Sequence, residues 1–363
     1  MIIKSLALND FRNIENLSIE FDKGLNIIYG DNAQGKTNIL ESIYVAGTTR
    51  SHKGSKDKEM IKIGREEAHI RVILEKDDSD RKIDLHLKKS KSKGVALDGV
   101  PVRKSADIFG ILQLIFFSPE DLTMIKDGPA ERRRFVDMEL SQIERIYLYN
   151  LSKYNKILTQ RNNLLKQISL DNKLSDTLDV WDEQLVATGS EIIKSREKFI
   201  AELNEIIKPI HNKLTGSKEE LEIEYNPNVI VETFENKLKN GRKADIYQKT
   251  TLTGPQRDDI TFYINKNDVR KFGSQGQQRS TALSLKLSEI ELFKKKTGYN
   301  PVLLLDDVLS ELDRHRQNYL IESIGDIQTI ITCTGLEEFV ENRKDTGRIY
   351  KITGGKIDNK SEV

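Results

Sequence analysis

One stretch decides the fold: Gly30-Asp31-Asn32-Ala33-Gln34-Gly35-Lys36-Thr37, which fits the pattern G-x-x-x-x-G-K-[ST]. Residues 25–29 before it are rich in β-branched and aromatic side chains, and residues 38–46 after it carry apolar side chains at helical spacing. A glycine-rich loop between a strand and a helix is the context that this pattern requires. The glycines let backbone N–H groups surround phosphate oxygens, and the helix start adds a favourable dipole. The stretch therefore predicts a P-loop that binds the phosphates of a nucleotide.

Four side chains are expected to carry the chemistry of this site. Lys36 should reach the β- and γ-phosphates, and the Thr37 hydroxyl should ligate Mg²⁺. An apolar strand over residues 302–305 ends in Asp306 and Asp307. Because α/β sheets bind ligands at the carboxyl ends of their strands, we expect Asp306 to hold Mg²⁺ and Asp307 to orient or deprotonate the attacking water. The alternative is that the two carboxylates cap a helix N-terminus.

A third motif lies between these two in the chain. It reads Ser274-Gln275-Gly276-Gln277-Gln278 and opens a helix predicted over residues 280–294. A small hydroxyl and a glycine at a helix start resemble the signature loop of ATP-binding-cassette (ABC) ATPases, which meets the nucleotide of the opposite subunit. Residues 310–313, just after the acidic strand, resemble the loop at the dimer seam of those enzymes. The order of the motifs strengthens the resemblance.

A competing motif is the segment Asn265-Lys266-Asn267-Asp268, which matches the guanine-reading N-K-x-D pattern of GTPases. It lies between two strand-like segments, where Asn and Asp favour a tight turn. The acidic strand also follows it, whereas GTPases have the opposite order. We therefore interpret the segment as a turn.

The middle of the chain predicts helices. Apolar side chains follow a three-four spacing over residues 131–168 and again over 178–210, and Glu144 and Arg161 interrupt the first stretch. A polar turn joins them at Asp171-Asn172-Lys173. The pattern predicts an antiparallel helical hairpin, either a protruding arm or two core helices of a lobe. The run Arg132-Arg133-Arg134 is either a basic helix face or the lining of a phosphate path for ATP or DNA.

The N-terminal region predicts strands. Residues 1–29 alternate in strand fashion, with a hairpin turn expected at Asp22-Lys23-Gly24, and residues 51–99 predict a small antiparallel β region. A last strand is expected at residues 329–332.

The composition limits the class of protein. The 363 residues suggest about two domains, and 58 Lys+Arg against 57 Asp+Glu leave no global basic field. Cys333 is the only cysteine, so a disulfide framework and a thiolate zinc site are excluded. The five histidines show no ligand spacing in the sequence. We find no signal peptide and no apolar run long enough to cross a membrane, which favours the cytoplasm.

Taken together, the motifs resemble the RecF family of bacterial recombination mediators, in the chromosome-maintenance (SMC) branch of ABC ATPases. Length and motif order match over essentially the whole chain. The matching segments are Phe11-Arg12-Asn13-Ile14, the P-loop, Leu40-Glu41-Ser42-Ile43-Tyr44, Phe117-Ser118-Pro119-Glu120-Asp121-Leu122, Arg132-Arg133-Arg134-Phe135-Val136-Asp137, Gly254-Pro255-Gln256-Arg257-Asp258-Asp259, Ser274-Gln275-Gly276-Gln277-Gln278-Arg279 and Leu305-Asp306-Asp307.

The resemblance implies an α/β fold with an ABC-type ATPase lobe, built from a RecA-like core plus an antiparallel β region, and a mainly helical second lobe. The expected boundaries are 1–118 and 297–363 for the ATPase lobe and 119–296 for the second lobe. ATP with Mg²⁺ would join two protomers, the signature residues Ser274, Gly276 and Gln277 meeting the partner's nucleotide, and Arg12 contacting the phosphates.

The resemblance also implies a biological role. The protein would bind double-stranded DNA and junctions of double- and single-stranded DNA at gaps and stalled forks, as an ATP-dependent homodimer. It would help RecR and RecO to load RecA, with no membrane partner.

Several positions depart from the family pattern. Ala33 replaces a glycine, Gln256 stands where histidine is common, and Thr332-Cys333-Thr334 lacks the histidine that many ABC proteins carry there. Asp307 stands where transporters have glutamate. We therefore expect a slow, DNA-stimulated ATPase that acts as a switch.

Two other classes of protein carry ABC-type motifs, and the sequence fits each of them less well. A chromosome-organising ATPase would need longer helical arms than this chain has. A transporter's nucleotide-binding subunit would have an LSGGQ loop, a switch histidine and no long helical hairpin, and the sequence fails all three criteria.

Overall fold

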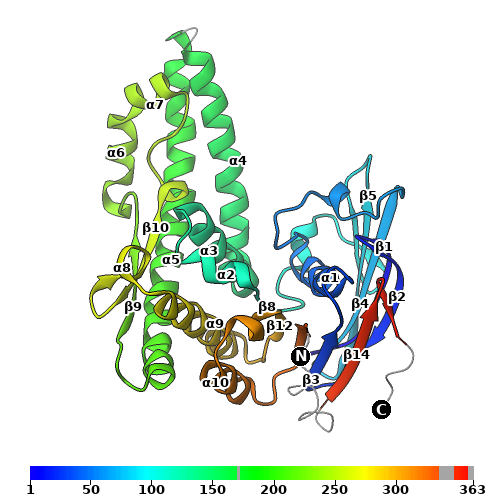
Figure 1. Ribbon diagram of the computed structural model, residues 1–363. Coiled ribbons are helices and arrows are strands. Elements are labelled where there is room, and N and C mark those ends of the chain that lie inside the picture. Colours follow the sequence, from blue (N-terminus) through cyan, green and yellow to red (C-terminus); the bar gives the residue numbers. More distant parts are fainter. Residues whose placement is uncertain (170–171, 335–346, 359–363) are drawn as a thin grey trace. The chain divides into compact units, whose positions relative to one another are not determined.

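A computed structural model describes residues 1–169, 172–334 and 347–358, and the chain forms two compact units (Figure 1). Unit 1 comprises Met1–Asp121 and Glu289–Val363, and unit 2 comprises Leu122–Ser288. The divisions fall inside two helices, α2 (Pro119–Met124) and α9 (Gln275–Thr297). The functional lobe boundaries at 118/119 and 296/297 stay a prediction.

Unit 1 contains a mainly parallel sheet of six strands. Its order is β15 (Lys356–Ile357), β14 (Gly347–Thr353), β3 (Leu25–Tyr29), β13 (Thr329–Cys333), β12 (Val302–Asp306) and β8 (Leu114–Phe117), with only the β14–β15 pair antiparallel. Strands β12 and β13 are buried along their whole length, as expected for parallel strands covered on both faces. The P-loop follows β3, Asp306 is the last residue of β12 and Asp307 follows it, so both motifs reach the same edge of this sheet.

The second sheet of unit 1 is antiparallel, which confirms the β region predicted over residues 51–99. Its order is β2 (Ile14–Glu20), β1 (Ile2–Phe11), β4 (Glu67–Lys76), β5 (Ser79–Lys88), β6 (Gly94–Leu97) and β7 (Val100–Pro101). Helix α1 (Lys36–Thr48) contacts strands of both sheets and buries most of its side chains. A helix that is buried on all sides holds the loop before it firmly.

The expected hairpin at residues 22–24 is wrong. Strands β2 and β3 belong to different sheets. The Asn26 side chain holds the corner by accepting from Asp22 N at 2.7 Å and donating to Asp22 O at 2.9 Å. The turn residues therefore mark a change of sheet. The remaining elements of unit 1 are η1 (Asp57–Glu59), η2 (Ser105–Ile108), η6 (Val308–Glu311) and α10 (Arg314–Ile324).

Unit 2 contains the predicted helical hairpin, α4 (Arg145–Ile168) against α5 (Leu178–Thr215), which contact each other along their lengths (Figure 1). The single helix expected over 131–168 is wrong, because the chain is extended at Glu144 (φ −124°, ψ 101°), which separates α3 (Pro129–Ile143) from α4. Asp171 of the predicted turn lies outside the described residues. The other elements are η3 (Asn172–Thr177), β9 (Leu221–Asn226), η4 (Val231–Thr233), α6 (Phe234–Asn240), α7 (Arg242–Gln248), η5 (Pro255–Arg257), β10 (Asp259–Ile264), β11 (Asn267–Asp268) and α8 (Val269–Phe272).

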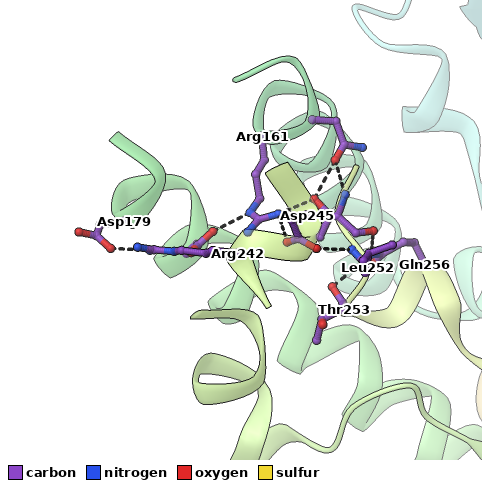
Figure 2. A network of polar contacts seen from close by, with 10 residues as sticks. Arg161, Asp179, Arg242, Asp245, Leu252, Thr253 and Gln256 are labelled. Atoms are coloured by element: carbon purple, nitrogen blue, oxygen red, sulfur yellow. Dashed lines mark hydrogen bonds and ion pairs between the residues drawn. The ribbon is translucent and has the colours of Figure 1, made fainter. Parts of the chain in front are cut away.

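The polar interruption at Arg161 is the centre of a buried ion network (Figure 2). Its guanidinium donates to Asp182 at 2.6 Å and to Asp245 at 2.7 Å. Asp182 also accepts from Arg242 at 2.8 Å. Because a buried charge is tolerated only when it is paired and hydrogen-bonded, the network fixes α4, α5 and α7 against one another.

The arginine run lies at the first turns of α3. Arg132 is buried and donates to both carboxylate oxygens of Asp259, at 2.8 and 3.0 Å. Arg133 donates to the backbone oxygen of Asp258 at 2.6 Å. Arg132 and Arg133 thus contribute to the packing of unit 2, whereas Arg134 is exposed. A phosphate path along this run stays a prediction.

The GTPase-like segment is a turn, as predicted. Asn265 and Lys266 have φ of 49° and 66° and join β10 to β11. Asp268 caps α8 by accepting from Arg270 N. The Asn265 side chain accepts from Glu220 N at 2.9 Å, so Asn265 and Asp268 both hold the structure of unit 2. Over the described residues, no helix has both the length and the apolar character that a membrane crossing requires.

Candidate nucleotide site and signature loop

The backbone of the P-loop requires its glycines. Gly30 has φ of 148°, and a Cβ there would lie 2.4 Å from the backbone oxygen of Ile352. Gly35 has φ of 108°, and a Cβ there would lie 2.9 Å from the Asn13 side-chain oxygen. Ala33 also has positive φ, 63°, in the region that favours glycine. The loop therefore folds tightly around its centre, with Asp31, Asn32 and Ala33 exposed at its tip.

Lys36 lies at the centre of this loop. Its Nζ donates to the backbone oxygens of Gly30 and Asp31, both at 2.7 Å. Burial lowers the pKa of Lys36 below its ordinary value, and the nearby carboxylates of Asp307, Asp306 and Asp31 partly oppose this effect. A phosphate at this position would replace the carbonyl oxygens with charged acceptors, which favour the ammonium more strongly.

Thr37 and Asp306 form the predicted metal-binding pair. The Thr37 hydroxyl donates to Asp306 Oδ1 at 2.9 Å, although 268 residues separate them in the chain. Adjacent oxygens around Mg²⁺ lie about 2.9 Å apart when the metal–oxygen distance is about 2.1 Å. The pair therefore fits two neighbouring positions of an octahedral Mg²⁺ site.

Thr332 is a site residue that sequence reasoning missed. Its hydroxyl donates to Asp306 Oδ1 at 2.7 Å and accepts from Asp307 N at 3.1 Å. Burial raises the pKa of Asp306, and the hydroxyls of Thr332 and Thr37 oppose the rise. Thr332 pairs with Asp306 across parallel strands β12 and β13, so it orients both predicted acids.

Asp307 begins the turn after β12 in a left-handed conformation, with φ of 52°. Its carboxylate accepts from the Thr334 hydroxyl at 3.4 Å. The side chain thus lies beside Lys36 and Asp306 at the strand edge, and its role toward water stays a prediction.

Asn13 and Gln34 brace the P-loop and were also missed as site residues. Asn13 donates to the backbone oxygen of Ala33 at 3.4 Å and accepts from the Asn38 side chain at 2.8 Å. Gln34 accepts from Gly354 N at 2.6 Å and from Gly355 N at 2.9 Å. Segments from both ends of the chain therefore hold the loop in place.

Arg12 points into unit 1 beside this loop. Its guanidinium bonds both carboxylate oxygens of Glu41, at 2.8 and 2.7 Å, and also reaches Ser55 and the backbone oxygen of Glu59. Burial opposes the charge of Glu41, but hydrogen bonds from Arg12 and Ser51 outweigh it and lower its pKa. Arg12 therefore anchors α1, and its contact with phosphates stays a prediction.

The signature segment lies at the start of α9, in unit 2. Ser274 Oγ accepts from Gln277 N at 3.2 Å, and Gln277 Oε1 accepts from Ser274 N at 2.9 Å. This reciprocal pair is a capping box. Gly276 lies inside the capped turn, and Ser274 and Gln275 are exposed. The hydroxyl and the glycine are thus presented at an ordered helix start.

The chain is similar to known proteins over nearly its whole length. The family model described as "RecF/RecN/SMC N terminal domain" matches residues 2–358. The DNA replication and repair protein RecF of Lachnoclostridium phytofermentans is 60% identical over 358 residues, which cover 99% of each chain.

Solved structures give the same assignment. The recombination mediator protein RecF with ATP, of the RecFOR pathway, has a TM-score of 0.92 at 36% identity and covers 98% of this chain and 96% of that one. An SMC head bound to the C-winged helix domain of ScpA has a TM-score of 0.56 at 17% identity and covers 99% and 98% of the two chains. The second similarity concerns the fold alone. The chain thus has the ABC ATPase fold of RecF and SMC heads.

Proposed function

This chain belongs to the RecF family of DNA replication and repair proteins, and we propose that it is an ATP-dependent DNA-binding protein of recombinational repair. The observation that carries the proposal is the Thr37–Asp306 hydrogen bond of 2.9 Å next to the buried Lys36. It brings the three groups that a P-loop ATPase needs to one sheet edge. The proposed location is the cytoplasm.

Each residue of the site has a defined task. Lys36 exchanges its carbonyl partners for oxygens of the β- and γ-phosphates of ATP. Thr37 and Asp306 would hold Mg²⁺, and the bound ion would neutralise phosphate charge. Thr332 keeps Asp306 oriented, and Asp307 positions the attacking water.

Hydrolysis is slow in this proposal. Thr332-Cys333-Thr334 carries no histidine, and burial raises the pKa of Cys333 to about 11, so its thiol stays neutral and is a poor base. Asp307 is then the remaining candidate to activate the attacking water. Steady-state turnover with and without DNA tests this point, and a rate of many turnovers per second contradicts it.

ATP acts as a switch between monomer and dimer. In the dimer, Ser274, Gly276 and Gln277 of one protomer meet the nucleotide on the P-loop of the other. The dimer binds double-stranded DNA and its junctions with single strands, and helps RecR and RecO to load RecA at gaps.

Sedimentation velocity of the Asp307→Asn variant tests the proposal, with and without ATP and with and without a gapped duplex. The variant slows hydrolysis and preserves the bound state. We expect a monomer that becomes a DNA-bound dimer only with ATP. A monomer that binds ATP but never dimerises leaves a P-loop ATPase and contradicts the dimeric switch.

A further inference from the structure

The solvent-facing side of the antiparallel sheet carries three metal-ligand side chains that the nucleotide site does not use. Glu67 and His69 are two residues apart on β4 and therefore point to the same face. His86 lies directly opposite His69 on β5 in the strand register. One ligand atom from each of the three lies within 4.8 Å of the others.

The three side chains already contact one another. The imidazole rings of His69 and His86 are stacked, with centroids 3.9 Å apart and planes at 27°. His86 Nε2 lies 2.5 Å from Glu67 Oε2. Ligand atoms of a tetrahedral zinc site lie about 3.3 Å apart, because zinc–nitrogen distances are about 2.0–2.1 Å. The ligand atoms lie within 4.8 Å of one another, so side-chain rotations that change their separations by up to about 1.5 Å would give this spacing.

The surroundings leave room for an ion. A hollow of about 400 Å³ adjoins the two histidines, and small residues, Gly94 and Ala96 of β6, lie along it. Arg71, which also lines the hollow, is paired with Asp84 at 2.5 Å.

We propose that Glu67, His69 and His86 bind one divalent transition-metal ion, of which Zn²⁺ is the expected species. Two imidazoles and one carboxylate suit such ions better than Mg²⁺ or Ca²⁺. Three protein ligands leave one position of a tetrahedral site to water. The ion joins β4 to β5 across the sheet, in addition to their backbone hydrogen bonds.

Zinc titration of the nucleotide-free full-length protein by calorimetry tests the site. Excess Mg²⁺ is present, because it occupies oxygen ligands such as Thr37 and Asp306 without competing for imidazole. We expect one Zn²⁺ per chain. Co²⁺, used as a spectroscopic probe, should give the intense visible bands of a four-coordinate site.

Variants assign the ligands. His69→Ala and His86→Ala should each weaken binding at least about tenfold, and Glu67→Gln should weaken it measurably. The matched control is His315→Ala, which removes an exposed histidine of α10 and should leave binding unchanged. ATP affinity should stay at the wild-type value in all four variants, which checks that they fold.

Two results overturn the proposal. One is the absence of saturable zinc binding. Glu67, His69 and His86 would then interact only through the hydrogen bond and the ring stacking. The other is zinc binding that both histidine variants retain at full strength, which would place the ion elsewhere.

Discussion

The two helices that begin at the predicted phosphate-binding motifs, α1 and α9, start in opposite ways. Helix α1 follows Gly35, which is left-handed and provides no side-chain cap. Helix α9 follows Ser274, whose capping box with Gln277 satisfies the helix start from within the chain. Both motifs place a glycine near a helix N-terminus, yet only one leaves its amides uncapped by side chains.

We expect this difference to separate a helix start that binds phosphate by itself from one that only assists. The first N–H groups of a helix need partners, and an anion can supply them. At α1 no side chain takes that place, and the Lys36 ammonium lies beside the loop amides. At α9 the cap already provides partners, so we expect this helix start to add only a hydroxyl and a close backbone to a nucleotide that α1 of another protomer holds.

Lys36→Ala should have the largest effect of the changes that test this difference. The phosphates lose their fixed cation, which amounts to about 3 kcal/mol or a hundredfold in ATP affinity. Titration with a fluorescent ATP analogue measures it. Lys23→Ala, an exposed lysine before β3 in the same unit, is the matched control and should bind as the wild type does. An equal loss of ATP affinity in both variants would mean that the net positive charge of the unit, and not the position of Lys36, governs binding.

Ser274→Arg should leave ATP binding by the monomer intact and abolish the ATP-dependent dimer. A long cationic side chain at this exposed helix start blocks the approach of a second protomer. Ser274→Asn is the control for the cap, because asparagine caps helices about as well as serine and adds little bulk. Sedimentation with ATP separates the two variants. A Ser274→Arg protein that dimerises normally would exclude a composite site.

Asp306→Asn should raise the stability of the ligand-free protein at pH 8 and lower its affinity for ATP with Mg²⁺. Burial raises the pKa of Asp306, so the folded chain binds this proton more tightly than the unfolded chain does. The ionised carboxylate therefore lowers stability above its folded pKa, and this penalty fades as the pH falls through that value. We expect the variant to unfold at higher urea than the wild type at pH 8, by a margin that shrinks near pH 4. Its affinity for ATP with Mg²⁺ should fall at least about tenfold.

Asp313→Asn provides a control of opposite sign for the stability measurement. Asp313 caps α10 by accepting from Arg316 N at 2.9 Å, and that bond lowers its pKa. This carboxylate stabilises the fold above its unfolded pKa, so the variant should lose stability at pH 8 and converge with the wild type in acid. A stability difference for Asp306→Asn that does not change with pH would contradict the buried-charge explanation.

The parts of the site that were predictable are those encoded in one continuous segment. Strand, glycine loop and helix around Lys36 follow from local spacing, and the two aspartates at the end of β12 follow from a buried apolar run. Thr332, Asn13 and Gln34 could not be found this way, because their roles depend on strand register and on contacts such as Gln34 with Gly354, 320 residues apart. Tertiary pairing decides these positions.

The wrong predictions have the same cause. The residues at 22–24 have turn chemistry, but the strands on either side join different sheets. The helix break at Glu144 has no glycine or proline to mark it. The histidines of the sheet showed no spacing, although His69 and His86 lie equally far from the turn at Asp77 and Asp78, where φ is positive. The hairpin register would have brought them together.

Ala33→Gly should have the smallest effect on stability and ATP affinity. It tests whether backbone strain at Ala33 limits the stability of the P-loop before α1. Ala33 is exposed and holds φ of 63°, a conformation that disfavours a Cβ by about 1–2 kcal/mol. Glycine removes that strain but loses about 0.5–1 kcal/mol of chain entropy on folding, so a gain of up to about 1.5 kcal/mol in the free energy of unfolding should remain in urea unfolding. ATP affinity should change little.

Gly30→Ala is the matched opposite of Ala33→Gly in the same loop. A methyl group there would lie 2.4 Å from the backbone oxygen of Ile352, so the loop cannot keep its shape, and both stability and ATP binding should fall. If Ala33→Gly instead destabilised the protein, entropy would outweigh strain at the loop tip. The loop's shape would then depend on its anchors at Asn13 and Gln34 more than on local backbone preference.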